Sequence, residues 1–179
     1  AWSLDWLLIV AVLSPLLAVT AVLIWLQSGR PLFFLQRRYG FNQQEFRIIK
    51  FRTMTTLDDG EVVLQVRRND PRVTRLGRFL RRWNIDELPQ LINVLMGEMS
   101  LVGPRPLPAD DGDFLGDVRR RLLVRPGITG LWQVSGRSDL SWDDAVRLDL
   151  YYVDNWSLVL DVHILWRTIG VVLRSKGAY

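Results

Sequence analysis

The sequence predicts an α+β fold that is mostly helical and that carries a membrane-inserted helical segment near its start. Three observations lead to this class. A run without charged residues covers 6–26, two short β-prone runs lie at 32–35 and 46–54, and helical periodicity or capping signals mark 72–83, 142–155 and 158–174. With 179 residues, the chain is long enough for one domain with its own core and a small appendage.

The segment 6–26 can cross a membrane, because roughly 1.5 Å per residue is enough for a hydrocarbon core of about 30 Å. Trp2, Trp6 and Trp25 lie near its ends, where interfacial aromatic residues are common. Ser14-Pro15 interrupts it, since proline removes a backbone hydrogen bond and Ser14 can bond the carbonyl groups that are freed. Two geometries stay open, a straight span and a helix-break-helix that returns to the same face. Because no methionine precedes Ala1, we expect a longer protein.

A β-hairpin is expected next. The runs 32–35 and 46–54 flank Arg38-Tyr39-Gly40-Phe41-Asn42, whose glycine and asparagine are typical of a loop. Lys50 and Arg52 have the same parity in the second run, which predicts that they share a face. That face is either a phosphate contact or an ordinary solvated strand surface.

Two adjacent carboxylates, Asp86 and Glu87, follow an arginine-rich amphipathic segment over 72–83. Such a basic helix suits an anionic surface or a phosphate site. Asp86 is predicted to be the N-cap of the next helix, with Pro89 in its first turn. The helix dipole would keep a carboxylate there ionised, as a nucleophile or metal ligand requires. The alternative is that Asp86 only caps the helix and Glu87 is solvated.

The C-terminal half contains two loop-like motifs and two capped helices. In Gly103-Pro104-Arg105-Pro106, prolines fix the backbone on both sides of one arginine. The segment 125–137, which begins with Arg125, is rich in glycine and proline. It could cradle a nucleotide diphosphate, but it matches neither a P-loop nor a dinucleotide fingerprint, so we expect a structural loop there. Ser141 and Ser157 are predicted to cap helices over 142–155 and 158–174. The second of these fits a helix docked half in the core and half in a membrane interface.

The charge composition favours an anionic ligand. Of 23 basic residues, all except Lys50 and Lys176 are arginine, which binds phosphate and carboxylate groups in bidentate fashion. Nucleic acid fits the charge equally well, so charge alone does not decide. The absence of cysteine excludes disulfides and thiolate chemistry, and a single histidine excludes a histidine-rich metal site.

Four motifs in fixed order resemble the bacterial sugar transferase family, the monotopic phosphoglycosyl transferases that start glycan assembly on polyprenyl phosphate. The motifs are Lys50-Phe51-Arg52-Thr53-Met54, Asp86-Glu87-Leu88-Pro89-Gln90-Leu91, the stretch 100–106 that ends in Gly103-Pro104-Arg105-Pro106, and Arg125-Pro126-Gly127-Ile128-Thr129-Gly130. The likeness extends from the membrane segment to the last helix. Further residues in 131–137 and 151–157 resemble the members that transfer galactose or glucose phosphate to undecaprenyl phosphate.

This resemblance implies a two-step, magnesium-dependent reaction. Asp86 would attack the β-phosphate of a UDP-sugar and release UMP, and polyprenyl phosphate would then take the phosphosugar from the carboxylate. Glu87 would help to position Mg²⁺ or assist proton handling, with Asp86 as its neighbour at the metal. The bound phosphates would contact Lys50, Arg81, Arg105 and Arg125.

The resemblance also implies an organisation and a location. Ser14-Pro15 matches the break of a re-entrant helix, so that 1–29 would form the membrane segment and 30–179 a catalytic domain with interfacial amphipathic helices around its site. That domain would lie on the cytoplasmic face of the bacterial inner membrane, in the assembly of O-antigen, capsule or exopolysaccharide. The implied partners are UDP-sugar, polyprenyl phosphate and membrane lipid, without nucleic acid, and a homodimer is allowed.

Three functional classes remain to be compared. The first is the phosphoglycosyl transferase, which releases UMP. The second is a membrane-anchored glycosyltransferase that moves only the sugar and releases UDP. The third is a non-catalytic adaptor that holds anionic lipid through its arginines, and it gives no reason for Asp86-Glu87 beside them.

Overall fold

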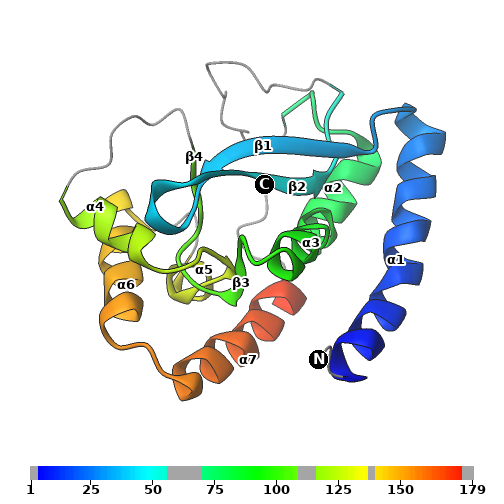
Figure 1. The fold of residues 1–179 in the computed structure, drawn as a ribbon. Coiled ribbons are helices and arrows are strands. Elements are labelled where there is room, and N and C mark those ends of the chain that lie inside the picture. The colour runs from blue at the N-terminus through cyan, green and yellow to red at the C-terminus, as the bar shows by residue number, and fades with distance from the viewer. Residues whose placement is uncertain (1–3, 56–69, 109–115, 137–139, 175–179) are drawn as a thin grey trace.

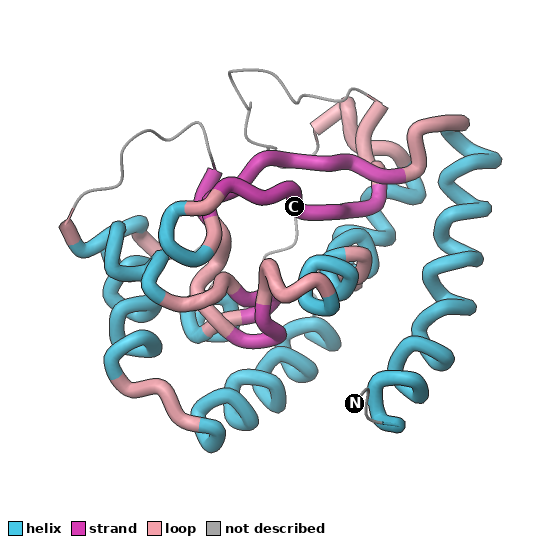
Figure 2. Tube along the Cα trace, viewed as in Figure 1, coloured by secondary structure: helices cyan, strands magenta, loops and turns pink. Residues whose placement is uncertain are grey.

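The computed structural model describes residues 4–55, 70–108, 116–136 and 140–174, with residues 4–12, 117 and 174 as backbone only. The fold is α+β and mostly helical, as predicted (Figures 1 and 2). The helices are α1 (Leu4–Ser28), α2 (Arg75–Arg82), α3 (Gln90–Leu95), α4 (Asp117–Arg120), α5 (Leu131–Ser135), α6 (Trp142–Asp154) and α7 (Leu158–Arg174). The strands are β1 (Phe33–Tyr39), β2 (Glu45–Phe51), β3 (Ser100–Val102), β4 (Leu107–Pro108) and β5 (Gly127–Thr129).

The predicted hairpin is confirmed. β1 and β2 pair antiparallel with Leu35 opposite Ile49, and β4 joins the free edge of β1, so the order in this sheet is β2-β1-β4. Arg38 and Tyr39 belong to β1 and not to the loop, which is shorter than expected and contains a 3₁₀ turn at Phe41–Gln43. The strands β3 and β5 form a separate parallel pair.

Helix α1 runs without interruption across Ser14 and Pro15, so the predicted helix-break-helix is not seen as two helices. A proline inside a helix removes one hydrogen bond and bends the axis without having to end the helix, and α1 is bent in Figure 1. Across the part of the chain that the structure describes, no helix combines the length and apolarity needed to cross a membrane. The re-entrant path and the division at residue 29 stay predictions.

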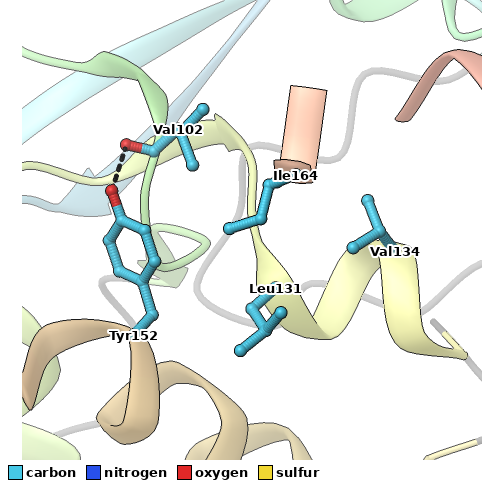
Figure 3. Packing of buried hydrophobic residues seen from close by; sticks show 5 residues of the cluster. All are labelled: Val102, Leu131, Val134, Tyr152 and Ile164. Carbon is cyan, nitrogen blue, oxygen red and sulfur yellow. Dashed lines mark hydrogen bonds between the residues drawn. The ribbon is translucent and has the colours of Figure 1, made fainter. Parts of the chain in front are cut away.

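Helices α6 and α7 begin at the predicted caps. The Asp144 N–H donates to Ser141 Oγ at 3.2 Å, and the Leu160 N–H donates to Ser157 Oγ at 3.2 Å. The buried face of α7 packs through Ile164 against Val102, Leu131, Val134 and Tyr152, and the Tyr152 hydroxyl donates to the Val102 carbonyl oxygen at 3.3 Å (Figure 3). These contacts join α5, α6 and α7 around β3.

The opposite face of α7 is apolar and exposed, which agrees with the expectation of a helix half docked in the core. Its exposed apolar residues are Leu158, Val159, Val162, Trp166, Ile169 and Leu173. A patch of this kind on one helix marks a surface that associates with another apolar phase or with a partner.

The segment 125–137 was expected to be a structural loop, and that prediction was wrong in part. Gly127–Thr129 forms β5, and Leu131–Ser135 forms the short helix α5. Leu131 and Val134 are buried against α6 and α7. This packing stabilises a helical turn where composition alone disfavours one.

Candidate active site

The two carboxylates lie on a 3₁₀ turn, Ile85–Glu87, between α2 and α3. Asp86 is therefore not the N-cap of a helix, because α3 begins only at Gln90 and its N-cap is Pro89. The reason lies in Asn84, whose left-handed backbone (φ 54°) turns the chain sharply after α2. The side chain of Asp86 is buried, with 8% of its surface exposed.

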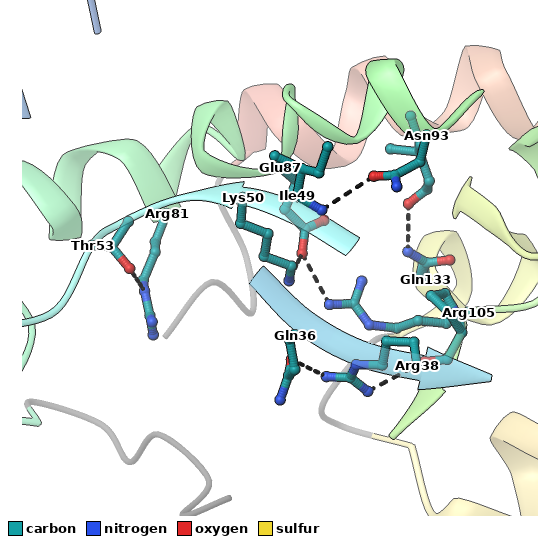
Figure 4. A network of polar contacts seen from close by, with 12 residues as sticks. Gln36, Arg38, Ile49, Lys50, Thr53, Arg81, Glu87, Asn93, Arg105 and Gln133 are labelled. Atoms are coloured by element: carbon teal, nitrogen blue, oxygen red, sulfur yellow. Dashed lines mark hydrogen bonds and ion pairs between the residues drawn. The ribbon is translucent and has the colours of Figure 1, made fainter. Parts of the chain in front are cut away.

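Glu87 is held by two cations that come from distant parts of the chain. Lys50 Nζ on β2 donates to Glu87 Oε1 at 2.7 Å, and Arg105 Nη2 donates to the same oxygen at 2.9 Å (Figure 4). The side chains of Lys50 and Glu87 are each 17% exposed, and that of Arg105 is 35% exposed. The structure thus brings three of the predicted site residues into direct contact.

The charges of these three groups depend on one another. Burial opposes ionisation of Glu87, but Arg105 and Lys50 outweigh it and hold the pKa of Glu87 well below its usual range. Burial lowers the pKa of Lys50, which the charge of Glu87 offsets in part. The charge of Glu87 raises the pKa of Arg105. Glu87 is accordingly a carboxylate anion at neutral pH.

The pKa of Asp86 is shifted in the opposite direction from that of Glu87. Burial, followed by the charge of Glu87, raises the pKa of Asp86 to about 6, while Lys50 and Arg81 act in the opposite direction. Two adjacent carboxylates with pKa values pushed apart are typical of acid–base or nucleophilic sites. The environment therefore gives the two acids separate roles.

Arg81 lies on the last turn of α2, on the side of Asp86. Its Nε donates to the Thr53 hydroxyl at 2.8 Å (Figure 4). Burial lowers the pKa of Arg81, and the charge of Asp86 counteracts this effect. The charge of Arg81 thus acts on Asp86, and its hydrogen bond to Thr53 fixes α2 to the segment after β2. Its predicted contact with a substrate phosphate stays a prediction.

The turn that carries Arg105 is fixed by close backbone packing. The Gly103 N–H donates to the Thr129 carbonyl oxygen at 2.9 Å, and the Gly127 N–H donates to the Pro104 carbonyl oxygen at 2.9 Å. A Cβ at Gly127 would lie 2.1 Å from the Gly103 nitrogen, so only glycine fits there. The third and fourth sequence motifs therefore form one unit that orients Arg105.

Arg38 of β1 supports the same turn. Its Nη1 donates to the Pro106 carbonyl oxygen at 3.3 Å, and its Nη2 donates to Gln36 Oε1 at 2.6 Å (Figure 4). The hairpin thus contributes to the site both through Lys50 and through the support of Arg105.

Two further arginines of the sequence prediction lie apart from this group of contacts. Arg125 is exposed, and within the described ranges no hydrogen bond or ion pair joins it to Lys50, Glu87 or Arg105. Lys50 and Arg52 were predicted to share a strand face that is either a phosphate contact or an ordinary solvated surface, but the Arg52 side chain is buried. The strand ends at Phe51, and the Arg52 side chain turns away to the carbonyl groups at the end of α1.

Asn93 is a site-forming residue that the sequence analysis did not identify. It is fully buried on α3. Its Oδ1 accepts from the Ile49 N–H at 3.1 Å (Figure 4). Its Nδ2 donates to the Arg47 carbonyl oxygen at 2.8 Å and to Glu98 at 2.7 Å. Asn93 therefore binds the strand next to Lys50 to the helix that follows Glu87. A lone asparagine in an apolar run was the only signal for it.

The residues that could hold a metal are limited. Among the described residues, no group of three or more histidine, cysteine, aspartate or glutamate side chains could hold a metal ion. Lys50 and Arg105 both bind Oε1 of Glu87, which leaves Oε2 and the Asp86 carboxylate as hard oxygen donors. Mg²⁺ commonly takes one or two carboxylates together with substrate phosphates and water. The dyad fits an ion that binds with a diphosphate.

The chain belongs to the bacterial sugar transferase family, whose pattern it matches over residues 3–175. The matched range includes the predicted membrane segment 6–26, the buried Asp86-Glu87 pair and the three cations around it. This confirms the resemblance drawn from the four motifs.

Several characterised proteins are similar to it. A UDP-galactose-lipid carrier transferase from Erwinia amylovora is 43% identical over 96% of this chain and 39% of the relative. The exopolysaccharide production protein ExoY from Sinorhizobium fredii is 42% identical over 93% of this chain and 81% of the relative. A UDP-glucose:undecaprenyl-phosphate glucose-1-phosphate transferase from Caulobacter vibrioides is 43% identical over 96% of this chain and 68% of the relative. The chain thus spans less than half of the first of these and about four-fifths of the second.

Proposed function

We propose that this chain transfers a phosphosugar from a UDP-sugar to a polyprenyl phosphate, which gives polyprenyl-diphosphate-sugar and UMP. The observation that carries the proposal is the buried Asp86-Glu87 pair held among Lys50, Arg81 and Arg105. Phosphoryl transfer depends mostly on positioning and charge neutralisation, and these cations supply both. The names of the similar proteins, which specify lipid carriers and glucose 1-phosphate, support the same reaction.

In the first step, an Asp86 carboxylate oxygen attacks the β-phosphorus of the UDP-sugar. The bond between that phosphorus and the bridging oxygen breaks, UMP leaves with this oxygen, and an aspartyl phosphosugar remains. Asp86 suits this role because Glu87 already neutralises Lys50 and Arg105 through hydrogen bonds, whereas Lys50 and Arg81 act on Asp86 through their charges. The positive charge of Arg81 also acts on Asp86 and favours its ionised form.

In the second step, an oxygen of polyprenyl phosphate attacks the same phosphorus, and the bond between this phosphorus and the Asp86 carboxylate oxygen breaks. The carboxylate is regenerated, and one site serves two bulky substrates in turn. Asp86 and Glu87 would hold Mg²⁺, which when bound supplies neutralising charge to the diphosphate. Lys50 and Arg105 keep Glu87 ionised and oriented for that purpose.

The exposed apolar faces support a position at a lipid surface. α7 carries one such face, and α1 carries another through Leu16, Val19, Val22, Leu23, Trp25 and Leu26. We infer that both faces contact the bacterial inner membrane from its cytoplasmic side, where the acceptor phosphate lies at the interface. A re-entrant path of α1 at Ser14-Pro15 would keep both ends of the helix on that side.

Analysis of the released nucleotide tests the proposal. The purified chain is incubated with Mg²⁺, polyprenyl phosphate and a panel of UDP-sugars that includes UDP-glucose and UDP-galactose. The proposal predicts UMP with at least one sugar. UDP would indicate a glycosyltransferase that moves only the sugar, and no nucleotide release with any sugar would favour the non-catalytic adaptor.

A further inference from the structure

Arg52 connects the C-terminal end of α1 to the strand that carries Lys50. Its side chain is buried. Nη1 donates to the Arg30 carbonyl oxygen at 3.1 Å, and Nη2 donates to the carbonyl oxygens of Gly29, at 2.9 Å, and Ser28. The last carbonyl groups of a helix lack partners within it and form the negative end of its dipole. Arg52 thus caps α1 from another element.

An apolar cluster next to this cap joins α1 to the elements of the site. Ile24 of α1 is buried against Phe51 of β2 and Leu80 of α2, and Ile85 packs on the same cluster. Their neighbours in the chain are Lys50, Arg81 and Asp86. The C-terminal end of α1 lies beside β1, β2 and α2 in Figure 1. A change in the direction of α1 would therefore displace residues that are adjacent in the chain to Lys50, Arg81 and Asp86.

The two substrates of the proposed reaction depend on α1 to different extents. A UDP-sugar reaches the dyad from water, whereas polyprenyl phosphate is presented by the lipid that the exposed apolar face of α1 contacts. A change in the angle between α1 and β2 would move the dyad relative to the lipid surface. It would leave the contacts among Lys50, Glu87 and Arg105 in place, since α1 contributes none of them.

We propose that Arg52 is a positioning residue that fixes the dyad relative to the lipid-facing helix α1. This inference rests on the proposed function. Loss of Arg52 slows transfer to polyprenyl phosphate in a membrane and leaves the reaction with the UDP-sugar intact. Arg52 acts through the orientation of α1 and does not contact the reacting groups.

The test compares the two steps in Arg52→Gln. UMP released without acceptor reports the first step, and transfer to polyprenyl phosphate in phospholipid vesicles reports the second. We expect the first to stay within about 2-fold of wild type and kcat/KM for the acceptor to fall roughly 10-fold or more, because a displacement on the order of 1 Å can cost about 100-fold. Arg47→Gln, which removes an exposed arginine from the same strand, is the matched control and should change neither step.

Equal losses in both steps, or no loss in either, would overturn the inference. Arg52→Lys covers the case in which Arg52→Gln fails to fold, because it keeps the charge but loses the fork that reaches three carbonyl oxygens. Its loss should be smaller and again confined to the acceptor.

Distance measurements give a readout that does not depend on activity. The sequence has no cysteine, so spin labels can be attached at Leu26→Cys on α1 and Arg47→Cys on β2. The distance distribution between the labels should broaden in Arg52→Lys. An unchanged distribution would contradict the role of Arg52 in fixing α1 relative to β2. Absence of UMP release by the wild type would instead contradict the proposed function. The label distances would still test whether Arg52 fixes α1 relative to β2.

Discussion

Lys50 and Glu87, 37 positions apart in the chain, meet at 2.7 Å between Nζ and Oε1. This ion pair joins the end of strand β2 to the turn before α3. Arg105 binds the same oxygen from a third element. Because two cations bind Glu87 through hydrogen bonds and neither binds Asp86 in this way, the two neighbouring carboxylates acquire opposite pKa shifts.

Arg105→Lys tests whether the geometry of the guanidinium matters beyond its charge. Lysine keeps the positive charge but loses the planar fork, so it cannot present the fixed, bidentate donor geometry of a guanidinium to a substrate phosphate. We expect turnover to fall roughly 10-fold or more with an unchanged melting temperature. Arg119→Lys, at an exposed position on α4, is the control and should retain full turnover. Normal turnover of Arg105→Lys would show that Arg105 is structural.

Asn93→Leu tests the connection between α3 and β2. Leucine fills a similar volume but leaves the Ile49 N–H and the Arg47 carbonyl oxygen buried without their partner. Each such loss costs about 1–3 kcal/mol, so the free energy of unfolding should fall by about 2–6 kcal/mol. Denaturant unfolding measures this, with the exposed Asn155→Ala as a control that should lose about 1 kcal/mol or less. Equal stability of Asn93→Leu and wild type would show that this network is dispensable.

The helices and the hairpin were accessible from the sequence because their signals are local. Ser141 and Ser157 mark helix starts through bonds that span three residues. The start of α3 was misplaced because Asn84 adopts a left-handed conformation that hydrophobic periodicity does not reveal. A short helix at Leu131–Ser135 was missed since buried contacts with α7, and not its composition, stabilise it.

The sequence predicted which residues belong to the site but not how they contact one another. The motifs identified Lys50, Glu87 and Arg105, yet nothing in their spacing showed that two cations share one oxygen of Glu87. The hydrogen bonds of Arg52 to the end of α1 were not expected, because strand parity applies only as far as Phe51, where β2 ends. Long-range register decides such contacts, and local patterns do not contain it.

The path of α1 can be tested with single cysteines, since the sequence has none. We predict that Ala1→Cys and Gln27→Cys are both protected from an impermeant thiol reagent added to intact cells. Pro15→Leu should shift α1 toward a straight span, because it restores the hydrogen bond that proline removes. Labelling of Ala1→Cys from outside in the otherwise unchanged chain would contradict the re-entrant path.

Asp86→Asn should stabilise the protein at neutral pH. Burial raises the pKa of Asp86 from 3.8 to about 6, so the folded state binds more protons than the unfolded state between about pH 4 and 6. Stability is therefore lost as pH rises through that window, by about 3 kcal/mol at most at 1.36 kcal/mol per pKa unit. Asparagine carries no such cost.

Thermal melting of both proteins in metal-free buffer measures this difference. Asp149, whose pKa burial also raises to about 6, is common to both proteins and cancels in the comparison. The variant should melt higher than wild type at pH 7.5, and the gap should close at pH 4. A variant that melts at or below wild type at pH 7.5 would show that the ionised Asp86 carboxylate does not destabilise the folded protein.

The central claim, that Asp86 forms a covalent intermediate, is tested most directly by trapping it. Wild-type protein given Mg²⁺ and a labelled UDP-sugar without acceptor should release at most about one UMP per active site. It should retain a phosphosugar label that hydroxylamine discharges, as expected for an acyl phosphate. Asp86→Asn should show neither UMP nor label. If UMP forms only when polyprenyl phosphate is present and no labelled protein can be trapped, the transfer is a direct displacement and Asp86 is not the nucleophile.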